Sequence, residues 1–270
     1  MSTTSCAVGG HLRDWRQRRR MSQLDLACEA EVSTRHLSFV ETGRAQPSRD
    51  MVLRLAERLE VPLRERNAIL VAAGFAPVFP QRPLDDPGLA GARKAVGLIL
   101  KGHEPYPALV VDRGWNLIAA NRMVAPMMAG AEEALRTPPV NVMRLTLHPR
   151  GLAPRIANLP EWRAHLLERL RRDLEATGDR GLAELLEELR GYPVPPGVRA
   201  PANEFAGVAV PFQMTTANGV LSFYSTTTVF GTPVDVTLSE LTLETFFPAD
   251  EQTAAAVRAI AEALPALPGG

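Results

Sequence analysis

The chain has 270 residues, of which 46% are hydrophobic, and its 30 cationic side chains balance 30 acidic ones. This length is sufficient for two domains that each bury a core. No apolar run approaches the roughly 18 residues of a membrane span, and the first residues lack the apolar stretch of a secretory signal. Cys6 and Cys28 match no metal-binding or redox spacing. We therefore expect a cytoplasmic protein with reduced thiols and no membrane partner.

The charge is distributed unevenly along the chain. Residues 1–80 contain twelve arginines and nine acidic residues, whereas the remainder contains 18 cationic and 21 acidic residues. This basic excess is too small to establish nucleic-acid binding in the absence of a motif.

Residues 1–76 are predicted to form an all-α domain of five short helices. Ser22 is suited to cap the second helix, and Asp25 completes a weak capping box three positions later. Ser33 is suited to cap the third helix, and Gly43 to end it. Apolar residues at helical spacing follow in the fourth and fifth helices. Short helices with tight turns indicate a compact domain.

Residues 77–87 are predicted to form a linker between two domains. They contain four prolines, Pro77, Pro80, Pro83 and Pro87. Prolines this close together cannot continue a helix, since each removes a backbone donor and fixes its own φ angle.

The second domain, residues 88–270, is predicted to be α+β with an antiparallel sheet, because an early hairpin needs later strands to complete a sheet. Arg113-Gly114 marks the turn of that hairpin, and Asn218-Gly219 marks a later turn. The predicted strands cover residues 108–112, 115–120, 208–216, 220–230 and 234–247, and the predicted helices cover 88–101, 121–128, 159–190 and 250–264.

The segment from Ser22 to Ser48 contains a dense set of fixed spacings. They are Ser22-Gln23, Leu26-Ala27, Val32-Ser33, Leu37-Ser38, Glu41, Gly43-Arg44 and Pro47-Ser48. In this pattern the segment resembles the phage-repressor type of helix-turn-helix found in the Xre family. The resemblance implies a transcription regulator that binds double-stranded operator DNA. It also implies a homodimer, since paired recognition helices match a two-fold operator.

The helix after Ser33 has the two faces that a recognition helix requires. Leu37 and Val40 are placed to face the core, which leaves polar and cationic side chains for the major groove. Arg35 is the preferred base reader, because its planar fork can donate to guanine O6 and N7 together. The residues expected at the groove are Ser33, Thr34, Arg35 and Ser38.

Other residues of the motif are expected to hold or orient it. Gln23, at the start of a helix, and Arg44, just past the recognition helix, are expected to contact phosphates. The family resemblance implies a structural ion pair between Arg16 and Glu41 beneath the motif. Phe39 has two open interpretations, contact with thymine methyl groups or packing.

Residues 107–122 open a second resemblance. Their hairpin ends in Ala120-Asn121-Arg122, and is followed by the segment 141–147, by Glu161-Trp162 in a helical stretch and by a β-rich end. This order is similar to the ligand-binding domain of MmyB-like regulators, which join an Xre helix-turn-helix to a PAS-like sensor. Ala120 stands where that family usually has tryptophan. The resemblance implies a pocket for a small apolar or amphipathic ligand such as a fatty acid, and no other cofactor.

Several apolar side chains are candidates for lining such a pocket. Each of them by itself is more typical of a core, and only the set favours a pocket. A ligand carboxylate would need a cationic partner, for which Arg144 is the candidate, with His148, Arg150 and Arg155 close to it in sequence. A solvated basic loop is the alternative for these four. The candidate lining residues are Trp115, Leu117, Met123, Met127, Met128, Phe212, Met214 and Phe223.

Two other classes of function stay open at this point. The second domain could serve only for dimerisation or partner binding, without a ligand. Alternatively it could be a fused enzyme, but pairs such as Asp235/Glu240 and Glu244/His148 have no supporting motif. The sequence has no glycine-rich phosphate loop and no nucleophile elbow, and its five histidines lack metal spacing. We therefore expect no catalytic residues and no metal.

Overall fold

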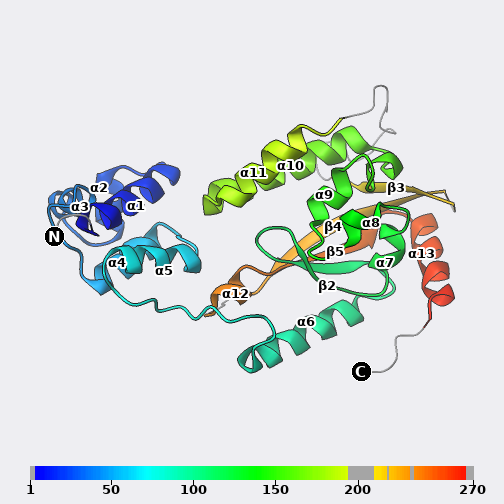
Figure 1. Ribbon diagram of the computed structural model, residues 1–270, viewed down its shortest axis with the longest axis horizontal. Coiled ribbons are helices and arrows are strands. Elements are labelled where there is room, and N and C mark those ends of the chain that lie inside the picture. Colours follow the sequence, from blue (N-terminus) through cyan, green and yellow to red (C-terminus); the bar gives the residue numbers. More distant parts are fainter. Residues whose placement is uncertain (1–3, 194–209, 218, 232–233, 266–270) are drawn as a thin grey trace. The chain divides into compact units, whose positions relative to one another are not determined.

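The computed structural model describes residues 4–193, 210–217, 219–231 and 234–265 (Figure 1). The chain divides into two compact units, Met1–Pro83 with Thr232–Ser239, and Leu84–Gly231 with Glu240–Gly270. Asn218 of the predicted turn and positions 208–209 of a predicted strand lie outside the described residues. Within the described part, no helix combines the length and the apolar character that crossing a membrane requires.

The first unit begins with the five helices that the sequence predicts. They are α1 (Thr4–Arg18), α2 (Gln23–Glu29), α3 (Thr34–Glu41), α4 (Arg49–Arg58) and α5 (Leu63–Ala72). Ser22 and Asp25 form the predicted capping box of α2, and the Ser33 hydroxyl accepts the His36 amide at the start of α3. These side chains satisfy amides that have no partner inside their helix.

The backbones of helices α1 and α3 are in direct contact at Gly9, which belongs to α1. A Cβ atom added to Gly9 would lie 2.3 Å from the Val40 carbonyl oxygen and 2.7 Å from that of Glu41. Only glycine fits there, because real side chains do not approach a backbone oxygen so closely. The two helices pack against a common core, which includes the fully buried side chains of Leu12 and Leu37.

The first unit extends past the boundary predicted at residue 76, because the side chain of Asn67 in α5 holds the following segment. Its amide nitrogen donates to the Phe79 carbonyl at 2.7 Å, and its oxygen accepts the amides of Val78 and Phe79 at 3.0 and 3.1 Å. Part of the proline-rich segment is therefore fixed to α5.

The prediction of one strand over residues 234–247 is wrong for its first part. Those residues instead form α12 (Val236–Ser239), and only Thr242–Pro248 form a strand, β5. The Asp235 carboxylate accepts the Thr237 amide at 2.9 Å and so stabilises a turn in place of extended backbone. Helix α12 belongs to the first unit, where Val236 is fully buried and its amide donates to the Pro80 carbonyl at 2.8 Å.

The second unit is α+β, as predicted, with a five-stranded antiparallel sheet. The order across the sheet is β2-β1-β5-β4-β3, so β5 is central and β2 and β3 form the edges. The other strands are β1 (Ala108–Val111), β2 (Leu117–Ala120), β3 (Phe212–Thr216) and β4 (Gly219–Val229), and the helices are η1 (Pro87–Leu89), α6 (Ala90–Gly102), α7 (Val124–Met128), α8 (Glu133–Arg136), α9 (Val142–Leu147), η2 (Ala153–Arg155), α10 (Leu159–Thr177), α11 (Arg180–Arg190) and α13 (Glu251–Ala263).

The long helical stretch predicted over 159–190 is divided into the antiparallel pair α10 and α11, which is visible in Figure 1. Gly178 ends α10 in the left-handed conformation, with φ of 67°. Asp179 then caps α11, since its side chain accepts the Gly181 amide at 2.6 Å. A left-handed glycine followed by a capping aspartate is a strong signal for a break between helices.

The alternation of side chains along the strands gives the sheet two different faces. Leu109, Phe223 and Phe246 are on the face that contributes to the main core with α9, α10 and α11. Val110 and Leu243 are on the opposite face, beside residues of α6. In Figure 1, α10 and α11 lie on one side of the sheet of this unit and α6 lies on the other.

Candidate functional site

Helix α3 presents the outward face expected of a recognition helix. Leu37 and Val40 are buried, Arg35 is exposed, and Thr34 and Ser38 are half-buried. The Ser33 hydroxyl oxygen caps α3, but its proton remains available for donation. The predicted base-reading residues are therefore grouped in the first turns of one exposed helix.

The expected ion pair between Arg16 and Glu41 is confirmed, and it lies beneath this face. Arg16 donates to both carboxylate oxygens of Glu41, at 2.6 and 2.8 Å, and the Glu41 side chain is fully buried. Burial by itself would raise the pKa of Glu41. Hydrogen bonds from Arg16 and Gln23, with the charges of Arg16 and Arg13, lower that pKa below its ordinary value. Glu41 is therefore ionised at neutral pH and joins α1 to α3.

Gln23 is the first residue of α2, as predicted, and its side chain also forms a hydrogen bond within the protein. Its amide nitrogen donates to Glu41 at 2.8 Å. An amide group carries two N–H donors, so one of them remains for a phosphate. The same network thus fixes the orientation of the residue that is expected to contact the DNA backbone.

Phe39 lies between two of the predicted DNA contacts. The guanidinium carbon of Arg35 is 5.4 Å from the centre of the Phe39 ring, and that of Arg44 is 6.0 Å from it. Both distances are within the range of cation–π attraction. The ring therefore orients the two arginines, a role that sequence reasoning missed. The signal available was the four-residue spacing from Arg35 to Phe39, which places both on one face of a helix.

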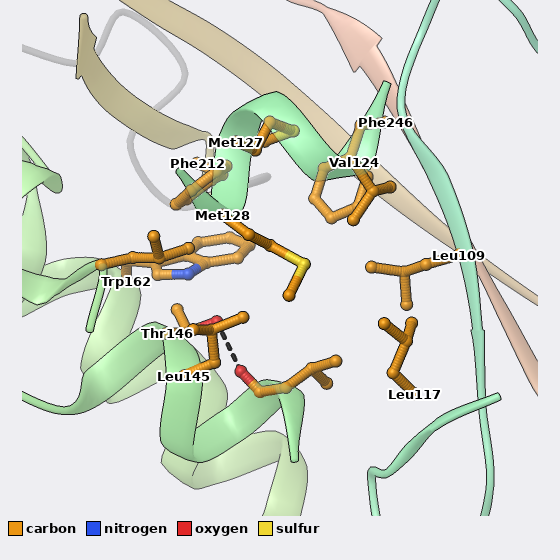
Figure 2. A pocket seen from close by; sticks show the side chains of 12 residues that line it. Leu109, Leu117, Val124, Met127, Met128, Leu145, Thr146, Trp162, Phe212 and Phe246 are labelled. Carbon is orange, nitrogen blue, oxygen red and sulfur yellow. Dashed lines mark hydrogen bonds between the residues drawn. The ribbon is translucent and has the colours of Figure 1, made fainter. Parts of the chain in front are cut away.

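The second unit contains a small apolar cavity of about 70 Å³, the Trp162 cavity. Figure 2 shows its wall, which side chains from β1, β2, α7, α9, α10, β3 and β5 form together. Among the described residues that line it, none is charged. They are Leu109, Leu117, Val124, Met127, Met128, Val142, Leu145, Thr146, Leu152, Trp162, Phe212 and Phe246.

A second cavity, the Arg155 cavity, has a volume of about 50 Å³ and shares Met127 with the first. The Arg155 guanidinium donates to the carbonyls of Met127 and Ala129 and lies 3.4 Å from the Met214 sulfur. Of the residues predicted to line one pocket, the structure places Leu117, Met127, Met128 and Phe212 at the Trp162 cavity, and Met123, Met127, Met214 and Phe223 at the Arg155 cavity.

Trp115 lines neither of these two cavities. Arg169 lies over its ring at 4.6 Å, and its indole nitrogen donates to Asp173 at 3.1 Å. Arg169 also donates to the buried carboxylate of Glu244. Burial raises the pKa of Asp173, against the lowering effect of Arg169. Trp115 is thus part of a charged cluster that joins α10 to the sheet.

Arg144 is also outside both linings. Its guanidinium makes a bidentate pair with Glu188 of α11, at 2.8 Å for the shorter contacts. Its neighbour in sequence, Arg150, pairs with Glu132 at 2.6 Å. Both guanidinium groups are therefore engaged with carboxylates of the chain itself.

Sequence reasoning did not identify Trp162 and Phe246 as lining residues. Trp162 shares a four-residue spacing with Leu166 and Leu170, which predicts a core position, and it is indeed buried. Phe246 belongs to a strand that closes the sheet from the far end of the chain. Which buried aromatic residues border a cavity depends on how α9, α10 and the sheet pack together, and no local pattern encodes that.

A third cavity, of about 220 Å³, lies beside α6 on the other face of the sheet, and we call it the α6 cavity. Its lining includes Ile99 and Val229, whose side chains are exposed by 44% and 60%. It is therefore a surface groove, whereas the lining of the Trp162 cavity includes the buried side chains of Leu145, Trp162 and Phe212.

Two family models match the chain. Residues 7–69 match a helix-turn-helix domain, and residues 92–260 match the MmyB-like transcription regulator ligand binding domain. No curated protein matches the chain. One solved structure, the clp gene regulator ClgR from Corynebacterium glutamicum, is 21% identical and covers 38% of this chain and 96% of its own, with a TM-score of 0.24. That likeness is too low to bear on function. The match over residues 92–260 spans more than half of the sequence, and the chain therefore belongs to the family defined by the MmyB-like transcription regulator ligand binding domain.

Proposed function

We propose that the protein is a homodimeric transcription regulator of the Xre type, whose binding to double-stranded operator DNA is modulated by a small apolar or amphipathic ligand of fatty-acid-like chemistry. The observation that carries the DNA-binding part is α3, whose outward face presents Thr34, Arg35 and Ser38 over a buried ion pair. Gln23 and Arg44 flank this face as phosphate contacts.

The Trp162 cavity supports the ligand part of the proposal. It is apolar, and Met127 and Met128 form part of its wall. A cavity of about 70 Å³ is smaller than the roughly 150 Å³ that holds benzene in an engineered core. A ligand therefore enters with a narrow alkyl segment, and the flexible methionine side chains adjust to it.

The path of the chain provides a route by which the ligand acts on DNA binding. Phe246 of β5 lines the cavity, and α12, which precedes β5 in the chain, packs in the first unit through Val236. A ligand that favours one position of β5 thereby favours one arrangement of α12. This modulation requires that the ligand bind the two states with different affinities.

Native mass spectrometry of the purified full chain, followed by denaturing identification of released molecules, tests the ligand part. We expect one adduct of lipid mass per subunit. Adding the identified molecule should then change the affinity for a footprinted operator. A protein that takes up no apolar molecule, even when medium-chain lipids are added in excess, contradicts the ligand part and leaves the DNA-binding part intact.

Exposed apolar side chains favour the second candidate, in which the second unit serves for dimerisation without a ligand. Leu98 and Ile99 of α6 are exposed by 63% and 44%, and Val229 of β4 by 60%. Surfaces of this kind are typical of protein contacts. Leu98→Lys should produce monomers in light scattering if α6 is the dimer contact, and the exposed Lys94→Glu in the same helix is the matched control. Because the first candidate is also a homodimer, a monomeric Leu98→Lys variant identifies the dimer contact, and only the absence of a bound ligand in the mass spectra separates the second candidate from the first.

A further inference from the structure

The indole nitrogen of Trp162 is a buried hydrogen-bond donor that is unsatisfied in the described part of the chain. The side chain is 4% exposed, and its nitrogen has no partner among the residues that the structure describes. The ring stacks on His165 with centroids 5.1 Å apart and contacts Phe212 at 5.2 Å. Most buried tryptophan N–H groups have a partner, because an unsatisfied buried donor is destabilising.

Trp162, which carries this unpartnered donor, is one of the residues that line the Trp162 cavity. In the view of Figure 2, the nitrogen is on the edge of the indole ring that faces Leu145 and Thr146. The other polar group of the wall, the Thr146 hydroxyl, donates to the Val142 carbonyl at 2.6 Å. Its proton is thus engaged, and its oxygen can only accept. Among the described lining residues, the Trp162 N–H is therefore a donor without a partner, and its nitrogen is covered by neighbouring side chains that a ligand has to displace to reach it.

The lining of the Trp162 cavity offers no direct partner for a negative charge. The described lining contains no cationic side chain, and Arg144 is paired with Glu188 outside it. Burial, with the positive charges of Arg169 and Arg172, lowers the pKa of His165, so the ring that stacks on Trp162 is neutral at neutral pH. A carboxylate placed in this lining would lose its hydration without a cationic lining side chain to pair with directly.

We propose that Trp162 is the specificity-determining residue of the ligand site, and that its indole N–H donates a hydrogen bond to a neutral acceptor on the ligand, a carbonyl, ester or hydroxyl oxygen. This inference rests on the proposed ligand-binding function and narrows the ligand class. The apolar wall binds an alkyl segment, and Trp162 selects chains that carry an uncharged oxygen. Any charged group of the ligand is at the end away from Trp162.

The test compares methyl octanoate, octanoate and octane on the full chain, by calorimetric titration and, for octane, by headspace partition. We expect Trp162→Phe to weaken methyl octanoate binding about tenfold, which corresponds to about 1.4 kcal/mol, and to change octane binding by less than about twofold. Phe212→Leu is the matched control, because it alters the same wall without removing a polar atom. This control should weaken both probes alike.

The wild-type protein gives a second measurement, which does not depend on how the variant folds. The indole N–H resonance of Trp162 should move downfield on addition of methyl octanoate and should not do so with octane. The proposal is overturned if Trp162→Phe weakens both probes equally, if the resonance does not respond to the ester, or if octanoate binds the wild type more tightly than the ester. If none of the three probes binds the wild type, the proposed ligand function fails together with this inference.

Discussion

Arg16 and Glu41 form a bidentate ion pair, at 2.6 and 2.8 Å, between the first helix and the end of the recognition helix. The pair fixes the orientation of α3 without taking up any of the side chains that face outward. A buried carboxylate that depends on one close cationic partner, with the more exposed Arg13 at 3.9 Å, is also a sensitive point, because removing one member of the pair leaves the other charge poorly compensated.

Glu41→Gln should therefore lower the free energy of unfolding by about 3 kcal/mol, because Arg16 stays nearly buried and loses its counter-charge. The effect depends on pH. The pKa of Glu41 is lowered in the folded protein from its ordinary value of 4.5. Its stabilisation is thus fully present above about pH 4.5 and is lost as pH falls through the folded pKa. Denaturant titrations of both proteins from neutral to acidic pH should show the difference shrinking below pH 4.5. Glu29→Gln, at an exposed position of α2, should have little effect at any pH.

Arg35→Ala should remove about 1–3 kcal/mol of discrimination between operator and non-specific DNA, because a bidentate contact to guanine is lost. Arg44→Ala is the informative comparison. As a phosphate contact it should weaken binding to all sequences and lower the salt dependence by about one released counterion. Salt titrations of operator and scrambled duplexes separate the two roles. Equal operator affinity for wild type and Arg35→Ala would refute base reading by Arg35.

Phe39→Leu should weaken operator binding about threefold to tenfold while leaving thermal stability nearly unchanged. The ring holds the Arg35 and Arg44 guanidinium groups at 5.4 and 6.0 Å, and each exposed cation–π contact is worth about 0.5–1 kcal/mol. A double-mutant cycle with Arg35→Ala measures the coupling between the two side chains. Strictly additive losses would show that Phe39 acts on DNA directly, through thymine methyl groups, and does not orient Arg35.

Val236→Ala should reduce the effect of ligand on operator affinity while preserving each binding reaction by itself. Val236 is fully buried in the first unit, and β5, which follows it in the chain, carries Phe246 of the Trp162 cavity. Loss of the buried methyl groups weakens the packing of α12 in the first unit. A change in β5 on ligand binding is then transmitted less effectively to α12. Val234→Ala is the matched control, since Val234 is 77% exposed. The measurement is operator affinity with and without saturating ligand, and an unchanged ratio in Val236→Ala would exclude this route.

The local features of the first unit could be predicted from the sequence because short-range physics determines them. Capping of α2 by Ser22 and of α3 by Ser33 depends on a side chain bonding to an amide three residues later. The spacing of Leu37 and Val40 determines the buried face of α3. In the same way, alternation and turn residues indicated β1, β2 and the antiparallel sheet, because each is encoded within a few neighbouring residues.

The tertiary structure alone decided which distant residues meet. A strand prediction over 234–247 was reasonable from composition, yet the hydrogen bond of Val236 to Pro80, more than 150 residues earlier, belongs to a helical turn. The same holds for the cavity, where Trp162, Phe212 and Phe246 come from three separate elements. A buried aromatic side chain has the same sequence signature whether it fills the core or borders a cavity. The difference is set by how completely the facing helices and strands fill the space between them, and only the folded chain determines that.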